Sequence, residues 1–296
     1  FRAVAQNAVF RRAHLGFSLG HTAHFHAIFG ADAHAADEQA RLAHLQQVLR
    51  IQFQLGGGYK LGLKRDGFLL LTGEVGTGKT TLIRYLLKSA DASTIIATIY
   101  DPMMPILDFY NFLSEEFGLN KKFFGKADFL IDLKSFLLKA YSEKQPVFLI
   151  IDEAQRLDHE RLEEIRLLSN IELDDQKLIN TFFVGQSETE TTLMDPINKA
   201  ISQRISMSYN LQPLDEKETQ HYIAHRLRVA GAKRGIFTVD ACKKIFDIAD
   251  GIPRLINSIC DCALLSGYVK DRKIIDTKFI GECQIELRIP IGTTTK

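Results

Sequence analysis

Residues 68–80, FLLLTGEVGTGKT, constrain the fold of this chain more than any other stretch. An apolar run at 68–72 leads directly into glycines at positions 73, 76 and 78, and these are followed by Lys79 and Thr80. The spacing is G-x-x-x-x-G-K-[ST], which requires a buried strand, a tight loop and a helix in that order. The stretch therefore predicts a strand–loop–helix unit within a parallel α/β sheet.

The chemistry of such a loop explains its residue types. Glycines let successive backbone N–H groups turn toward bound phosphates, and the following helix points its positive end at them. We expect Lys79 to reach the β- and γ-phosphates and the Thr80 hydroxyl to ligate Mg²⁺. The alternative is a glycine-rich turn that binds no nucleotide. The combination of strand, loop, Lys-Thr pair and helix argues against this alternative. The predicted nucleotide-binding residues are Gly73, Glu74, Val75, Gly76, Thr77, Gly78, Lys79, Thr80 and Thr81.

An acidic pair follows a second apolar run, at 147–151. A carboxylate at the tip of a buried strand beside the phosphate loop can hold Mg²⁺ through water, and we predict this role for Asp152. Glu153 can accept a proton from the attacking water or orient it. The pair alone is only moderately specific, whereas together with the loop it indicates nucleotide hydrolysis.

The stretch KLINTFFVGQ, at 177–186, predicts a further strand. Its C-terminal end should lie between the ends of the first and third strands. Gln186, or a close neighbour, can then sense the γ-phosphate or hold the attacking water. The alternative is a polar residue at a strand end with no catalytic role.

Strands and helices alternate through this part of the chain. Helical patterns at 80–89, 109–119 and 128–144 separate predicted strands at 68–72, 93–100, 147–151 and 177–186. Such alternation predicts a parallel, doubly wound sheet flanked by helices.

The pattern changes to helices without strand signals over residues 210–287. Asp215 and Glu218 have the D-x-x-E spacing of a capping box at the start of one helix. Thr238 can cap a second helix, and Pro253 suits the first turn of a third. We therefore expect a small helical bundle here.

A break in composition near residue 59 sets the beginning of the chain apart. Residues 1–59 hold six of the nine histidines but none of the twenty lysines. The break could mark a separate domain, a tag or fusion, or a stretch whose residues are not those of the native gene. A helical pattern occupies 37–53, and the histidines of HTAHFH, at 21–26, have no carboxylate or cysteine at ligand spacing beside them.

Charge, hydropathy and cysteine content narrow the classes of function. The net charge of +1 gives no whole-molecule attraction to nucleic acid or anionic lipid. No apolar run approaches the roughly 18 residues needed to span a bilayer, so we expect no membrane helix. The four cysteines fall in the last quarter without zinc-ribbon spacing and are interpreted as reduced thiols of a helical region.

Several stretches in combination resemble one group of proteins. The chain is similar to AAA+ ATPases of the general secretion pathway protein A (ExeA-type) family, whose relatives include exosortase-associated ATPases and ATPase helpers of some transposons. The resemblance covers about residues 60–287, and the stretches that carry it are GEVGTGKT at 73–80, LIIDEAQ at 149–155, FVGQSE at 183–188, ISQRI at 201–205, LQPLDEKET at 211–219 and GIPRLINSICDCALL at 251–265.

This resemblance implies a fold and two further catalytic residues. The fold is the α/β P-loop NTPase (AAA+) fold, a parallel sheet flanked by helices with a small all-helical C-terminal lid. Arg204 is similar to an arginine finger, which reaches the γ-phosphate of a neighbouring subunit and so links hydrolysis to oligomer assembly. Arg254 matches a second sensor in the lid. A surface arginine is the alternative for Arg204.

The resemblance also implies ATP and Mg²⁺ as cofactors, although nothing in residues 1–59 repeats the segment that helps family members hold adenine. The expected domains are an N-terminal segment of uncertain origin, an ATPase core, a helical lid and a tail, at 1–58, 59–209, 210–287 and 288–296.

Three functions remain open. The first is an oligomeric Mg-dependent ATPase that drives assembly or remodelling in envelope secretion or exopolysaccharide export, cytoplasmic or peripheral at the inner membrane. The second is a DNA-associated ATPase helper of transposition, which needs a local basic strip. The third is a nucleotide-binding interaction module, disfavoured by Asp152, Glu153 and Arg204. Candidates for the basic strip are Lys121, Lys122, Arg226, Arg228, Lys233, Arg234, Lys243 and Lys244.

Overall fold

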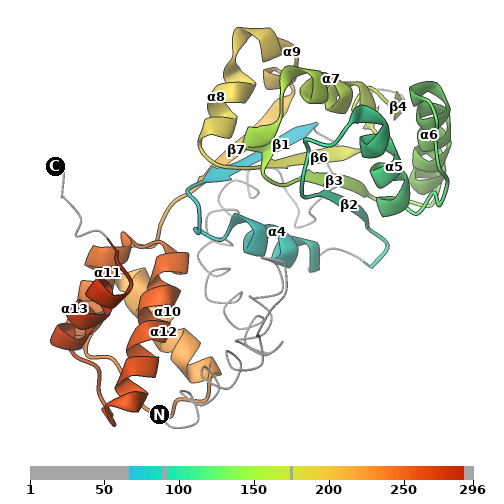
Figure 1. Ribbon diagram of the computed structural model, residues 1–296. Coiled ribbons are helices and arrows are strands. Elements are labelled where there is room, and N and C mark those ends of the chain that lie inside the picture. Colours follow the sequence, from blue (N-terminus) through green and yellow to red (C-terminus); the bar gives the residue numbers. More distant parts are fainter. Residues whose placement is uncertain (1–66, 89–91, 174–175, 290–296) are drawn as a thin grey trace. The chain divides into compact units, whose positions relative to one another are not determined.

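The computed structural model describes residues 67–88, 92–173 and 176–289 (Figure 1). These residues fall into two compact units. The α/β unit contains residues 67–75 and Lys79–Gln212. The helical unit contains the residues from Pro213 onward, together with Gly76–Gly78. The predicted segment 1–58, with its helical and histidine-rich stretches, and residues 290–296 of the predicted tail lie outside the described residues.

Five parallel strands form the sheet of the α/β unit, in the order β2-β3-β6-β1-β7. The buried apolar residues of β1 and β3 explain the continuous runs seen in the sequence, because strands covered on both faces have no polar side. β6 pairs with both β1 and β3, which confirms the predicted place of this strand between the first and third. The strands are β1 (Phe68–Gly73), β2 (Ile95–Ile99), β3 (Val147–Ile151), β6 (Asn180–Val184) and β7 (Ile205–Leu211).

Helices flank this sheet. In the view of Figure 1, α7, α8 and α9 lie above the strands and α4 lies below them. α5 and α6 place apolar residues at helical spacing in the core, where Phe109, Leu113, Phe129 and Leu133 are fully buried. The helices are α4 (Lys79–Lys88), α5 (Ile106–Glu116), α6 (Lys126–Ser142), α7 (His159–Leu168), α8 (Glu188–Met194) and α9 (Lys199–Ser202), with 3₁₀ turns η2 (Ala154–Arg156) and η3 (Pro196–Asn198).

Two strands differ from the sequence prediction. The strand expected at 177–186 begins only at Asn180, because Lys177 belongs to a separate antiparallel pair, β4 (Glu172–Leu173) with β5 (Gln176–Lys177). β7 was not predicted at all. It ends at Leu211, so the domain boundary expected between residues 209 and 210 falls inside this strand.

The helical unit consists, in its described part, of α10 (Glu216–Val229), α11 (Val239–Ala249), α12 (Pro253–Val269) and α13 (Thr277–Glu286). The capping box of Asp215 and Glu218 forms with both of its hydrogen bonds, at 2.8 Å each. Thr238 caps α11, and Pro253 is the first residue of α12, as predicted. α13 was not predicted, although Asp276 caps it through the Phe279 N–H.

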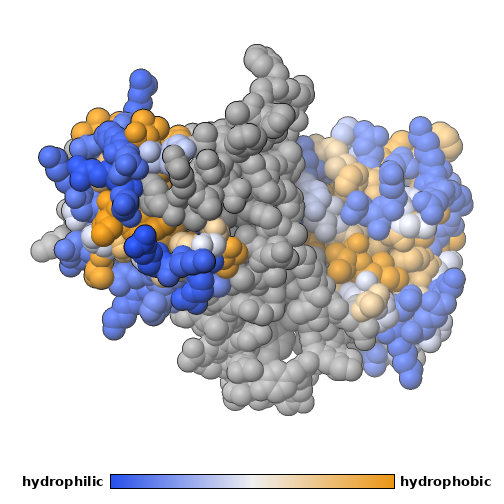
Figure 2. Space-filling view, turned by 90° about the horizontal axis from the view of Figure 1, so that it is seen from below, coloured by the Kyte–Doolittle hydropathy of each residue, from blue (hydrophilic) through white to orange (hydrophobic). Residues whose placement is uncertain are grey.

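The surface of both units is mixed on the face that Figure 2 shows. Polar residues cover much of it, and apolar residues emerge in smaller groups between them. The exposed side chains of Phe124 and Ile131 line one open pocket, and a small number of exposed apolar residues is ordinary in globular proteins. Within the described residues, no helix combines the length and apolar character needed to cross a bilayer.

Candidate nucleotide-binding site

The phosphate loop follows β1 and ends at α4, as its spacing requires. Gly76 and Gly78 have φ angles of 91° and 96°, a region that residues with a Cβ rarely adopt. β1 ends at the carboxyl edge of the sheet, the edge at which parallel α/β folds bind ligands. The loop therefore has the backbone conformation that a phosphate cradle needs.

Lys79 begins α4 and folds back over this loop. Its ammonium donates hydrogen bonds to the carbonyl oxygens of Gly73, at 2.7 Å, and Glu74, at 2.9 Å. Burial lowers the pKa of Lys79, and the nearby carboxylates of Glu153 and Asp152 partly oppose this shift. The site thus holds a half-buried cation that a bound phosphate would stabilise further.

Thr80 and Asp152 meet although 72 residues separate them in sequence. The Thr80 hydroxyl donates to Asp152 Oδ2 at 2.9 Å. Asp152 is 8% exposed, and burial raises the pKa of its carboxyl, while the bond from Thr80 lowers it. A hydroxyl beside a carboxylate is the all-oxygen donor set that suits Mg²⁺.

Glu153 occupies an unusual backbone position directly after Asp152. Its φ and ψ angles are 54° and 38°, the left-handed conformation, and its N–H donates to Asp152 Oδ1 at 3.0 Å. The side chain is exposed, as an activator of water requires. Strained backbone of this kind gathers at functional sites.

Gln155 links this acidic pair to the end of β6 and was not assigned a role from the sequence. Its amide nitrogen donates to Glu153 Oε2 at 2.6 Å, and its amide oxygen accepts the Gln186 N–H at 3.1 Å. The backbone N–H of Gln186, which the sequence predicted to lie at the site, is thus linked to the acidic pair through Gln155. The feature of the sequence that could have indicated a role for Gln155 was its position two residues after Glu153.

Arg204 lies at the opposite edge of the sheet. It immediately precedes β7, and its carbonyl accepts the Phe68 N–H at the start of β1, whereas the phosphate loop follows the end of β1. Its guanidinium contacts the C-terminal end of α7, donating to Asn170 Oδ1 at 2.6 Å and to Ser169 Oγ at 3.0 Å. The structure therefore does not bring Arg204 together with Lys79 in the same chain.

Arg254, the predicted second sensor, is the second residue of α12 and is exposed. It belongs to the helical unit, whereas Lys79, Thr80 and Asp152 belong to the α/β unit. Its predicted role toward the nucleotide stays a prediction.

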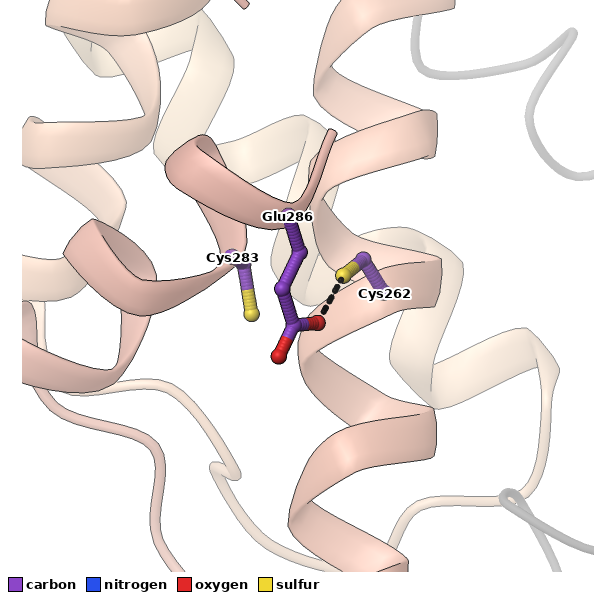
Figure 3. Close-up of side chains that lie close together, drawn as sticks. All are labelled: Cys262, Cys283 and Glu286. Atoms are coloured by element: carbon purple, nitrogen blue, oxygen red, sulfur yellow. Dashed lines mark hydrogen bonds between the residues drawn. The ribbon is translucent and has the colours of Figure 1, made fainter. Parts of the chain in front are cut away.

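A separate group of side chains lies in the helical unit, where all four cysteines are free thiols. The ligand atoms of Cys262, Cys283 and Glu286 lie within 4.8 Å of one another, and the Cys262 thiol donates to Glu286 Oε2 at 3.5 Å (Figure 3). Burial, with smaller effects of Cys262 and Glu286, raises the pKa of Cys283 to about 12. The hydrogen bond from Cys262 to Glu286 joins α12 to α13, and we interpret the group as part of helix packing.

Comparisons with known proteins agree with this geometry. A family model described as AAA domain matches residues 63–193. General secretion pathway protein A of Aeromonas hydrophila is 39% identical over 205 residues, which are 69% of this chain and 38% of that protein. The chain contains an AAA domain and is related to general secretion pathway protein A. The resemblance predicted from the sequence is therefore confirmed.

Solved AAA+ structures share its fold. Cdc6p from Pyrobaculum aerophilum matches with a TM-score of 0.64 and 20% identity, covering 86% of this chain and 69% of that one. The ORC2 protein of Aeropyrum pernix, solved as ADPNP and ADP complexes, matches with a TM-score of 0.60 and 18% identity over 84% of this chain and 67% of that one. These matches confirm the predicted AAA+ fold with its helical C-terminal part.

The similarity to general secretion pathway protein A covers only part of that protein's length. The chain spans 38% of that relative, so the activity and partners of the whole relative do not transfer with the similarity.

Proposed function

We propose that this AAA+ protein hydrolyses ATP with Mg²⁺. The observation that carries the proposal is the Thr80–Asp152 hydrogen bond at 2.9 Å, because it joins the phosphate loop to the acidic pair across the sheet. Lys79 would bind the phosphates, Thr80 and Asp152 would hold the ion, and Glu153 would activate water. Bound Mg²⁺ would neutralise charge on the phosphate oxygens. A nucleotide-binding module without hydrolysis would have no use for the exposed carboxylate of Glu153.

ATP is proposed over GTP from the relatives. The ORC2 protein of Aeropyrum pernix was solved with ADPNP and ADP, and both of these ligands are adenine nucleotides. The family resemblance points in the same direction.

We further propose that the protein acts as a homo-oligomer in which Arg204 serves a neighbouring copy. β1 separates Arg204 from the phosphate loop by six residues, on the order of 20 Å, which is beyond the reach of an arginine side chain. Arg204 also lines an open pocket of about 170 Å³ at that edge, with Lys177 and Gln203, so another chain can approach it.

The proposed role is assembly or remodelling within an envelope secretion or export machinery, at the cytoplasmic face of the inner membrane. The similarity to general secretion pathway protein A supports this assignment over DNA transactions. Two members of the candidate basic strip have partners within the chain, since Lys121 pairs with Asp132 at 2.6 Å and Arg226 packs on the Tyr222 ring.

The experiment compares ATP hydrolysis by the wild type and Glu153→Gln at saturating Mg²⁺. The variant should bind ATP with near wild-type affinity and lose at least about a hundredfold in turnover, because its amide cannot accept the proton of the attacking water. Phosphate release measures turnover, and fluorescence of a labelled ATP analogue measures binding.

Glu143→Gln is the matched control. Glu143 is an exposed residue at the end of α6, and its i,i+4 ion pair with Lys139 has little energetic weight. It should retain wild-type turnover. Normal hydrolysis by Glu153→Gln would remove Glu153 from the mechanism.

A further inference from the structure

The side chain of Gln155 is the only link that the described structure shows between the Glu153 carboxylate and the end of β6. Its nitrogen donates to Glu153 Oε2 at 2.6 Å. Its oxygen accepts the Gln186 N–H at 3.1 Å. An amide has its donor and its acceptor on one plane, so a single side chain joins the two groups.

The space around this amide is fixed by the neighbouring backbone. A Cβ placed on Gly185 would lie 2.8 Å from the Gln155 amide oxygen and 2.1 Å from the Thr189 hydroxyl oxygen. Gly185 itself is held to the sheet, because its N–H donates to the Leu71 carbonyl at 3.0 Å. Leu71 lies in β1, two residues before the phosphate loop, so the amide rests against a rigid part of the site.

Glu153, in contrast, is acted on by the charge of nearby Lys79 but accepts no other hydrogen bond that the described structure shows. It is exposed, and its backbone is in the left-handed conformation that a residue with a Cβ adopts only when neighbouring contacts hold it. The Glu153 N–H bond to Asp152 fixes the backbone. The hydrogen bond from Gln155 is the directional contact of the carboxylate, whereas the charge of Lys79 attracts it without fixing its orientation.

We propose that Gln155 is a positioning residue for hydrolysis, which sets the direction of the Glu153 carboxylate and couples it to the end of β6 at Gln186. The inference rests on the proposed ATPase function and adds a residue to it. Gln155 touches neither nucleotide nor water in this role, and it acts through Glu153.

The test replaces Gln155 by Met, which keeps its length but removes both hydrogen bonds, and by Glu, which loses the donor and sets a second carboxylate beside Glu153. Both variants should lose about tenfold to a hundredfold in kcat while the KM for ATP and the affinity for an ATP analogue stay within about threefold. Steady-state phosphate release and analogue binding measure this split.

A second measurement separates positioning from folding. In the Glu153→Gln background, Gln155→Met should produce no further loss of turnover, because the carboxylate through which it acts is already gone. An independent structural role would add its loss in full and would lower analogue affinity as well. Gln145→Met is the matched control, since Gln145 lies just before β3, at the opposite end from Glu153, and it should leave kcat unchanged.

The outcomes distinguish the two proposals. An active wild type with kcat retained in Gln155→Met overturns the positioning role alone. A fully additive loss in the double variant overturns it as well. A wild type that binds ATP but never turns it over overturns the proposed hydrolysis and the positioning role together.

Discussion

At the scale of single residues, the predicted phosphate site contains Lys79, whose protonated form is disfavoured by burial. Burial lowers the pKa of Lys79, so the protonated form is less favourable in the folded protein than in the unfolded chain. A group shifted in this direction opposes folding at any pH below its folded pKa. Two loop carbonyls compensate in part, and bound phosphate would compensate more.

Lys79→Ala should therefore abolish ATP binding without destabilising the nucleotide-free protein. Saturating ATP at a hundred times its Kd stabilises a protein by about 2.7 kcal/mol, and this gain should disappear. Thermal unfolding with and without MgATP measures both effects.

Lys134→Ala, on the exposed face of α6, is the control and should keep the full ATP-induced shift. An unchanged shift in Lys79→Ala would contradict the assigned site, and a large drop in the nucleotide-free melting temperature would contradict the sign of the pKa argument.

At the scale of elements, α10, α11 and α13 of the helical unit each begin at a residue whose side chain caps the helix. Asp215, Thr238 and Asp276 each accept a hydrogen bond from a backbone N–H of the first turn. Each cap satisfies a donor that the helix itself leaves without a partner. The apolar faces that follow, with Ile245 on α11 and Ile256 on α12, then meet in one core.

Thr238→Ala should lower the free energy of unfolding of the helical unit by about 1 kcal/mol, because the Ala241 N–H loses its 3.1 Å bond to the Thr238 hydroxyl. Urea denaturation followed by circular dichroism measures the change. Ser258→Ala, in the interior of α12, where the hydroxyl only bonds back to Arg254, should stay within about 0.5 kcal/mol. Equal losses in the two variants would argue against a capping role.

At the scale of the whole molecule, the proposed catalytic groups lie at two edges of one sheet. The phosphate loop and acidic pair lie at the carboxyl ends of the strands, and Arg204 lies at the amino end of β7. One copy can complete the site of another only when the two edges meet in a head-to-tail interface, which generates a ring or filament.

Mixing Arg204→Ala with Lys79→Ala should restore ATPase activity that neither variant has alone. In an equal mixture, about a quarter of the interfaces join an intact nucleotide site to an intact Arg204. The rate per subunit should also rise steeply with wild-type concentration and be insensitive to duplex DNA at low salt. Strong stimulation by DNA would instead favour the transposition-type function.

Asn170→Ala controls for the contact of Arg204 with α7, because it removes the 2.6 Å hydrogen bond but leaves the guanidinium. It should keep its activity. If it lost activity as Arg204→Ala does, or if the mixture stayed inactive, Arg204 would be a structural residue and not a finger.

The sequence by itself determined the elements whose signals are local. The loop spacing at 73–80, the apolar runs of β1 and β3, and the D-x-x-E box at Asp215 each depend on a few neighbouring residues, and the structure contains all of them. β7 also had a local signal, the alternation in ISMSYNL, but its serines and asparagine concealed a half-buried edge strand. α13 had an Asp276 cap and Phe279, Ile280 and Cys283 on one face, which its short length concealed.

Only the tertiary structure decided which distant groups meet. Thr80 reaches Asp152 across 72 residues, Gln155 reaches Gln186 across 31, and Arg204 reaches Asn170 across 34. These contacts depend on strand order and register. The sequence predicted the place of β6 between β1 and β3, but the register between strands is set by their hydrogen bonding and is encoded by no local pattern. The residue types of the site could therefore be predicted from the sequence. The side-chain network around Glu153 and the separation of Arg204 from Lys79, in contrast, follow from the folding of the sheet.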